Sequence, residues 1–403
     1  MSYFKEFPFT TAAPQIVDFW AGRKAVKKDV KNLVQTFKNT KQAQITTVWG
    51  AYGNGKTHTI KYIKYLFGDS CIFIYSPYSK AGRNFGELYK QTFIANYDFK
   101  QFGIACKRIY QEASKSKHVD DALDKIGTDI WGDGSGNVWY EFSNVVTQVG
   151  LVYDAAVNDS EAFRDERTRI AIRWLTGETI TKPERHEIGV SSNAKADEQF
   201  HRLCYILIRL SNSKYGGNKP IVWALDDCQV IVQFDKEKMK PLVNDRAKSQ
   251  VQQGIRTVFD YSHSGLLILL GLATADKDHV SSIFVPDILS RLSPIKIELE
   301  SFSDDLKEPL EFIHDIMNNE KFKLTAEIAK SMKLKLPKHK SEWYPFQNEK
   351  VVTETLEKIL DASDDFTPRS IMKTFGDIVA QAQIKKLEEI DTKFIEKYFA
   401  AHE

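Results

Sequence analysis

The sequence has few of the features that mark secreted, membrane-embedded or metal-stapled proteins. Its 403 residues include only four cysteines, and their lack of C-x-x-C spacing predicts neither a zinc site nor a disulfide framework. No stretch of about 18 uncharged apolar residues is present, so we expect no membrane span. The N-terminus lacks the basic-then-apolar pattern of a secretory signal. These absences predict a cytoplasmic protein with no membrane partner.

Charge of either sign is not in excess. The chain carries 56 basic and 54 acidic residues, a formal net charge of +2. Duplex DNA would therefore have to bind a local basic patch, without sequence specificity, because the whole chain gives no basic signal. Two basic stretches, over 23–31 and 333–340, are candidates. Each is as well explained by a solvated helix face.

A single motif gives the strongest functional signal. Residues 50–57 run Gly-Ala-Tyr-Gly-Asn-Gly-Lys-Thr and match the phosphate-binding loop pattern G-x-x-x-x-G-K-T. An apolar run precedes the motif and a helical apolar pattern follows it, which is the strand–loop–helix context that the motif needs. The glycines let successive N–H groups face phosphate oxygens, and the helix adds the positive end of its dipole.

This motif predicts a nucleoside triphosphate site. We expect Lys56 to contact the β- and γ-phosphates and Thr57 to bind Mg²⁺. The loop residues expected around the phosphates are Gly50, Gly53, Asn54 and Gly55.

A second motif supports the first. The apolar run Ile221–Leu225 ends in two carboxylates, Asp226 and Asp227. At the end of a strand, Asp226 can hold Mg²⁺ through water, and Asp227 can orient or deprotonate an attacking water. Two acidic residues in a surface turn are the alternative explanation.

Apolar runs separated by helical patterns indicate the fold class. The alternation predicts an α/β fold with a parallel sheet and helices on both faces, and ligands in such sheets bind at the carboxyl ends of the strands. The five predicted strands are Ile45–Trp49, Cys71–Tyr75, Ile221–Leu225, Leu266–Gly271 and Ile295–Leu299.

With these motifs, the chain resembles an AAA+ P-loop ATPase. It is most similar to the branch of origin-recognition initiators, transposition-regulator ATPases and bacterial defence ATPases of the BREX-associated kind. The resemblance implies ATP and Mg²⁺ as cofactors. The segment Phe19–Arg23 is similar to the F-x-G-R element of the family, with an altered spacing, and implies a nucleotide contact for Arg23.

Three further family elements have counterparts. Thr274, at the end of the fourth strand, is similar to the sensor-1 residue that positions water. Arg291 in Ser290-Arg291-Leu292 is similar to an arginine that enters a neighbouring subunit's site. Arg369, in Thr367-Pro368-Arg369-Ser370 at a helix start, is similar to the sensor-2 arginine that reaches the γ-phosphate. For both arginines, an ordinary structural role is the alternative.

The chain departs from the family pattern at Asp227, where many members have glutamate. Aspartate is one methylene shorter, so we expect ATP hydrolysis that is slow or stimulated by a partner. A slow-hydrolysing signalling switch, similar to the STAND class, therefore stays open.

The predicted domain organisation has three parts. Residues 1–41 form an N-terminal helical segment, 42–300 the nucleotide-binding core, and 301–403 a C-terminal helical lid. The core contains a helical insertion at about 81–219, longer than an ordinary crossover. Helical patterns in the insertion cover Glu87–Asn96, Ile104–Ala113, Glu161–Leu175 and Glu198–Leu210. Those in the lid cover Leu306–Met317, Thr325–Met332, Val351–Leu360, Ser370–Ala382 and Thr392–Ala400.

The leading functional hypothesis is an ATPase that controls oligomeric assembly on DNA or on a protein partner in a phage-defence or mobile-element system. The expected partners are further copies of the chain, duplex DNA, and a nuclease, methyltransferase or transposase. The alternatives are a transposition regulator that forms DNA-bound filaments and the slow-hydrolysing switch.

Overall fold

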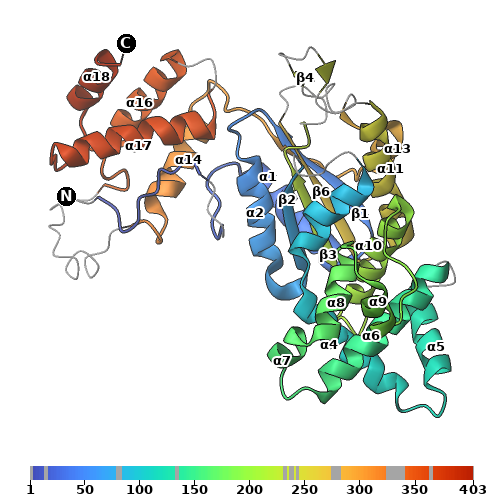
Figure 1. Cartoon of the computed structure of the whole chain (residues 1–403). Coiled ribbons are helices and arrows are strands. Elements are labelled where there is room, and N and C mark those ends of the chain that lie inside the picture. Colours follow the sequence, from blue (N-terminus) through green and yellow to red (C-terminus); the bar gives the residue numbers. More distant parts are fainter. Residues whose placement is uncertain are drawn as a thin grey trace. The chain divides into compact units, whose positions relative to one another are not determined.

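The computed structural model describes residues 3–12, 17–78, 84–131, 136–229, 234–235, 240–241, 245–273, 283–323, 341–362 and 366–402 (Figure 1). Three predicted features lie outside these ranges: Thr274, the lid helix Thr325–Met332 and the second basic stretch. In the described part of the chain, no helix combines the length and the apolar character needed to cross a membrane.

A five-stranded, all-parallel sheet lies at the centre of the fold. Its order is β2-β3-β6-β1-β7. All residues of β3 and all but the last of β6 are buried, which explains why these strands appear in the sequence as unbroken apolar runs. Each predicted strand is confirmed to within two residues, as β1 (Gln44–Gly50), β2 (Ile72–Pro77), β3 (Ile221–Asp226), β6 (Leu266–Ala273) and β7 (Ile297–Leu299).

The register brings the carboxyl ends of neighbouring strands level. Pro77 at the end of β2 pairs with Asp226 at the end of β3, and Leu225 pairs with Leu270 of β6. Asp226 therefore lies at the carboxyl edge of the sheet, where parallel-sheet proteins bind their ligands. A second, two-stranded antiparallel sheet joins β4 (Phe234–Asp235) and β5 (Lys240–Pro241).

The chain divides into two compact units. One comprises Met1–Lys31, Trp49–Leu66 and Ile297–Glu403, and the other Asn32–Val48 and Phe67–Lys296. The predicted boundaries at 41 and 300 stay predictions.

The first unit contains the phosphate loop and the C-terminal helices. In its core, Tyr3, Phe4 and Phe9 pack in one cluster with side chains of these helices, and the Tyr3 hydroxyl donates to the Leu387 carbonyl at 2.7 Å. The described helices are α2 (Lys56–Phe67), α14 (Lys307–Asn318), α16 (Glu349–Ala362), α17 (Pro368–Ile384) and α18 (Thr392–Ala400). The last four confirm predicted lid helices. The N-terminal helix, α1 (Lys24–Thr40), has residues in both units.

The second unit holds the insertion, which is helical as predicted. Two predicted insertion helices are confirmed, as α4 (Phe99–Ala113) and α10 (Asp197–Asn212). The predicted helix over 161–175 is two helices, because Asp165 breaks the run and caps the second: α7 (Asp159–Arg164) and α8 (Glu166–Leu175). The pattern at 87–96 forms the end of α3 (Phe85–Leu88) and a tail of π-helical and 3₁₀ turns.

Three insertion helices were not predicted, α5 (Val119–Trp131), α6 (Gly136–Ala155) and α9 (Lys182–Glu187). The unit is completed by α11 (Asp245–Ser262) and α13 (Pro286–Leu289). Helices α4 and α6 pack closely, since a Cβ added at Gly103 would lie 2.1 Å from the Tyr153 ring.

Candidate functional site

The phosphate-loop motif occupies the turn between β1 and α2, as its pattern requires. A Cβ added at Gly50 would lie 2.2 Å from the Leu299 carbonyl oxygen, and one added at Gly53 would lie 2.9 Å from the Thr367 hydroxyl. Packing therefore explains the glycines at these two positions. Gly55 shares with Gly53 a φ of +90°, but a Cβ added at Gly55 would meet nothing within 4 Å. Its glycine serves the backbone conformation and leaves open space beside the loop, as phosphate binding needs.

The end of the loop adds positive charge. Lys56 is buried at the first position of α2, and its Nζ donates to the carbonyls of Gly50 at 3.0 Å and Ala51 at 2.8 Å. Thr57 follows in the same helical turn. A lysine ammonium and a helix N-terminus at one loop both favour an anion. The loop thus has the donors and the space that a phosphate group needs.

Two side chains connect the loop to the end of β7 and to the residues that follow it. The Asn54 amide donates to the Leu299 carbonyl at 2.9 Å and to the Ser301 hydroxyl at 3.3 Å. Arg23 donates to the carbonyls of Asn54, at 2.7 Å, and Glu300, and its guanidinium lies 4.9 Å from the centre of the Phe302 ring.

These contacts account for the burial of both residues. Burial lowers the pKa of Arg23 to about 10, and only 6% of its surface is exposed. Both side chains thus bind the protein's own carbonyls. The Asn54 Oδ1 is buried without a partner among the described residues. Contact of Arg23 and Asn54 with a nucleotide stays a prediction.

The start of α17 lies close to the phosphate loop. Thr367 caps the helix in a reciprocal pair with Ser370, and Pro368 stands in the first turn. Arg369 follows, with its Cβ 3.2 Å from where a Gly53 Cβ would lie. Its guanidinium stacks on the Tyr52 ring at 4.5 Å. Arg369 is thus beside the phosphate loop, where its predicted role requires it.

The two carboxylates at the end of β3 differ in environment. Asp226 is buried and accepts hydrogen bonds from the Tyr75 hydroxyl at 3.1 Å and the Asp227 N–H at 3.0 Å. Asp227 is exposed and adopts φ +58°, which is uncommon outside glycine. Its Oδ1 accepts from the Gln229 amide at 3.2 Å, and the Gln229 Oε1 accepts from the Ala273 N–H at 2.9 Å. Backbone strain of this kind gathers at functional sites.

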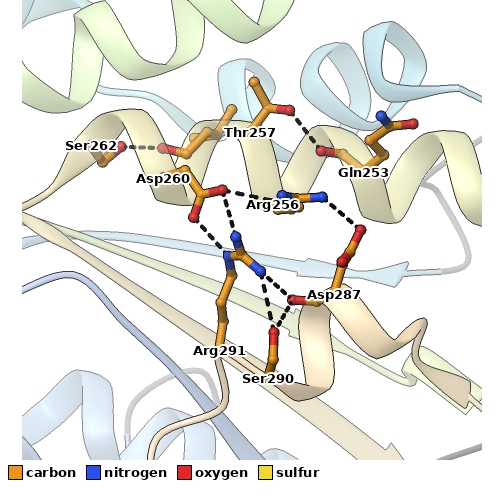
Figure 2. A network of polar contacts seen from close by, with 9 residues as sticks. Gln253, Arg256, Thr257, Asp260, Ser262, Asp287, Ser290 and Arg291 are labelled. Carbon is orange, nitrogen blue, oxygen red and sulfur yellow. Dashed lines mark hydrogen bonds and ion pairs between the residues drawn. The ribbon is translucent and has the colours of Figure 1, made fainter.

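Arg291 is held within its own chain (Figure 2). Its Nε and Nη2 donate to the two carboxylate oxygens of Asp260 at 2.7 and 2.8 Å. Its Nη1 donates to the Asp287 carbonyl at 2.8 Å and to the Ser290 hydroxyl at 3.3 Å. Arg256 completes the network by pairing with both aspartates.

This network limits what Arg291 can do in a single chain. The hydrogen bonds with Asp260 raise the pKa of Arg291, so its guanidinium stays protonated. To reach a neighbouring subunit's nucleotide, the guanidinium would have to leave that carboxylate. The role in trans stays a prediction.

His58, in the first turn of α2 directly after the phosphate-loop motif, packs against the segment before α1. Its ring lies 5.9 Å from that of Phe19 and 6.1 Å from that of Trp20. Burial, opposed by a backbone hydrogen bond with Phe19 and aided by the charge of Lys61, lowers the pKa of His58 to about 4. The imidazole is thus neutral near pH 7.

Sequence reasoning missed three side chains that contact predicted functional residues. Tyr75 donates a hydrogen bond to Asp226, which is 151 residues away in sequence. Gln229 links Asp227 to the end of β6. The Tyr52 ring makes a cation–π contact with Arg369. Tyr52 and Gln229 lie next to recognised motif residues, so their positions could have drawn attention. Nothing local to Tyr75 distinguishes it from any other tyrosine in a strand.

No protein-family model matches the chain, and no curated protein matches it either. The functional assignment therefore rests on the residues themselves. Among the described residues, no three histidine, cysteine, aspartate or glutamate side chains gather to hold a metal.

Strain at Asp227 can be measured with two variants that both remove its carboxylate. We expect Asp227→Gly to be more stable than Asp227→Ala by about 1 kcal/mol, because only alanine retains a Cβ at positive φ. Urea denaturation of both variants measures the difference. An alanine variant as stable as the glycine variant would show that the position is unstrained.

The partly buried imidazole of His58 predicts a pH effect on stability. Since the pKa of His58 falls from 6.5 to about 4 on folding, the unfolded chain takes up a proton first as the pH drops. The neutral ring's contribution is therefore intact above about pH 6.5 and is lost progressively towards pH 4. We expect His58→Phe to lose less stability than the parent between pH 7 and 5, measured by urea midpoints. Equal losses would contradict the assignment.

Proposed function

We propose that the chain is an AAA+-type P-loop ATPase, which binds ATP with Mg²⁺ at residues 50–57 and hydrolyses it. One observation carries the proposal: a complete phosphate-loop motif lies between a parallel β-strand and a helix N-terminus, with Lys56 in the first helical position and open space at Gly55. A chance match to the motif would not be expected in this context.

The residues of the loop supply positive charge and N–H donors. Lys56 neutralises the β- and γ-phosphates, and the backbone N–H groups from Gly53 to Thr57 surround them. The Thr57 hydroxyl and Asp226, the latter through water, would hold Mg²⁺. The ion, when bound, neutralises charge that develops on the transferred phosphoryl group. The Tyr75 hydroxyl orients the Asp226 carboxylate.

Other side chains would act on water and on the terminal phosphate. Asp227 positions the attacking water, with its carboxylate held by Gln229, and Thr274 assists in this. Arg369 contacts the γ-phosphate from the lid and so distinguishes ATP from ADP. Arg291 acts on the nucleotide of a neighbouring subunit, which makes the active enzyme an oligomer.

Assembly would occur on duplex DNA or on a protein partner. Exposed lysines along α1, among them Lys24, Lys28 and Lys31, support a salt-sensitive, non-specific contact with phosphates. The nucleotide state of the assembly would control a partner nuclease, methyltransferase or transposase of a phage-defence or mobile-element system. In one form of this proposal, the chain is a transposition regulator that assembles into DNA-bound filaments.

A slow-hydrolysing switch is the second candidate. Two observations favour it: Arg291 already uses Nε, Nη1 and Nη2 within its own chain, and aspartate stands where a longer glutamate is usual for water activation. An isolated chain would then hydrolyse ATP slowly until assembly releases Arg291 from Asp260.

Nucleotide binding can be tested with two lysine variants of one helix. Lys56→Ala should abolish ATP binding, since it removes the ammonium from the phosphate loop, whereas Lys64→Ala, at an exposed position of α2, should leave binding unchanged. Calorimetric titration with ATP and Mg²⁺ measures both. Full affinity in Lys56→Ala would refute the proposed site.

Sharing of the site between subunits can be tested by mixing inactive variants. Asp227→Ala and Arg291→Ala should each hydrolyse ATP poorly, and mixed oligomers should recover part of the activity, because one interface in each pair retains both residues. The readout is phosphate release. Absence of recovery, with mixed oligomers confirmed, would contradict action in trans.

A further inference from the structure

Tyr52 is an exposed aromatic residue within the phosphate loop. It occupies a variable position of the motif, where phosphate binding calls for backbone N–H groups and no particular side chain. About 73% of its surface is exposed, yet one face of its ring is covered by the Arg369 guanidinium, 4.5 Å from the ring centre. The phosphate loop thus contains an aromatic ring, that of Tyr52, which Arg369 contacts.

Gly53 makes this contact possible. A Cβ at this position would lie 2.9 Å from the Thr367 hydroxyl and 3.2 Å from the Arg369 Cβ. Only glycine lets the first turn of α17 come this close to the loop. The capping pair of Thr367 and Ser370, together with Pro368, fixes where that turn begins. The capped start of α17 therefore fixes the position of Arg369 next to Tyr52.

Stacking has a chemical advantage over an ion pair for an arginine that must bind phosphate. A tyrosine ring attracts the face of the guanidinium, so the N–H donors in its plane stay available and the charge is not neutralised. Arg291 shows the opposite arrangement, with its N–H groups directed at Asp260. Among the described residues, Arg369 has no ion pair with a carboxylate.

We propose that Tyr52 is a positioning residue, which holds Arg369 over the phosphate loop so that its guanidinium is preorganised for the terminal phosphate of ATP. This inference rests on the proposed function. Because ADP lacks the γ-phosphate, Tyr52 contributes to ATP affinity and not to ADP affinity. Its effect passes through Arg369 and disappears when that arginine is removed.

The test compares variants that keep or remove the aromatic face. Tyr52→Phe keeps the face, and Tyr52→Leu keeps apolar bulk without it. We expect unchanged ATP affinity for Tyr52→Phe and a loss of about two- to five-fold for Tyr52→Leu, the range of an exposed cation–π contact. ADP affinity should stay the same in both. Tyr140→Leu, at a similarly exposed tyrosine of α6, is the matched control.

Calorimetry with a non-hydrolysable ATP analogue, and separately with ADP, provides the affinities. Arg369→Ala should lower analogue affinity by about ten-fold or more, and adding Tyr52→Leu should lower it no further. An equal Tyr52→Leu effect with and without Arg369, or equal losses for the analogue and ADP, would overturn the inference alone. A parent protein that binds neither nucleotide would overturn the proposed function as well.

Discussion

The candidate site depends on how the phosphate loop is held against the last residue of β7, Leu299, and the residue that follows it, Glu300. Gly50 has no room for a side chain beside the Leu299 carbonyl, Asn54 donates to that same carbonyl, and Arg23 joins Asn54 to Glu300. The loop is therefore shaped by contacts that are about 250 residues away in sequence. A loop held in this way can direct its N–H groups without rearranging when an anion arrives, which is the preorganisation that binding of a charged group needs.

Because of these contacts, the residues of the phosphate-loop motif have different structural roles. Gly50 and Gly53 permit close packing, Gly55 leaves space, and Asn54 serves the framework more than the ligand. The arginines divide similarly. Arg23 is buried and donates to backbone carbonyls. Arg291 donates to Asp260 through Nε and Nη2 and to the Asp287 carbonyl through Nη1, whereas the Arg369 guanidinium lies over the Tyr52 ring. Of the three, Arg369 is best prepared to meet a phosphate, because its contact is with the Tyr52 ring and, among the described residues, it has no ion pair with a carboxylate.

The sheet could be predicted because strands buried on both faces appear as continuous apolar runs, and β3 and β6 are such strands. The missed helices have physical reasons. Helix α6 is rich in valine and aromatic residues, whose weak helix propensity is overridden by packing against α4. Helix α9 has Pro183 in its first turn, beside a capping box of Thr181 and Glu184, and a proline is tolerated there although it would break a helix further along. Partners such as Tyr75 for Asp226 could not be predicted, since only the tertiary fold brings them together.

The most direct test of the account is steady-state ATP turnover measured against protein concentration, with and without duplex DNA, using Lys56→Ala as the blank. The account predicts turnover above the blank, with specific activity that rises with concentration because Arg291 acts across subunits, and rises further when DNA promotes assembly. Turnover per chain that is independent of concentration would contradict the shared site. Turnover no higher than that of Lys56→Ala under every condition would contradict the ATPase itself.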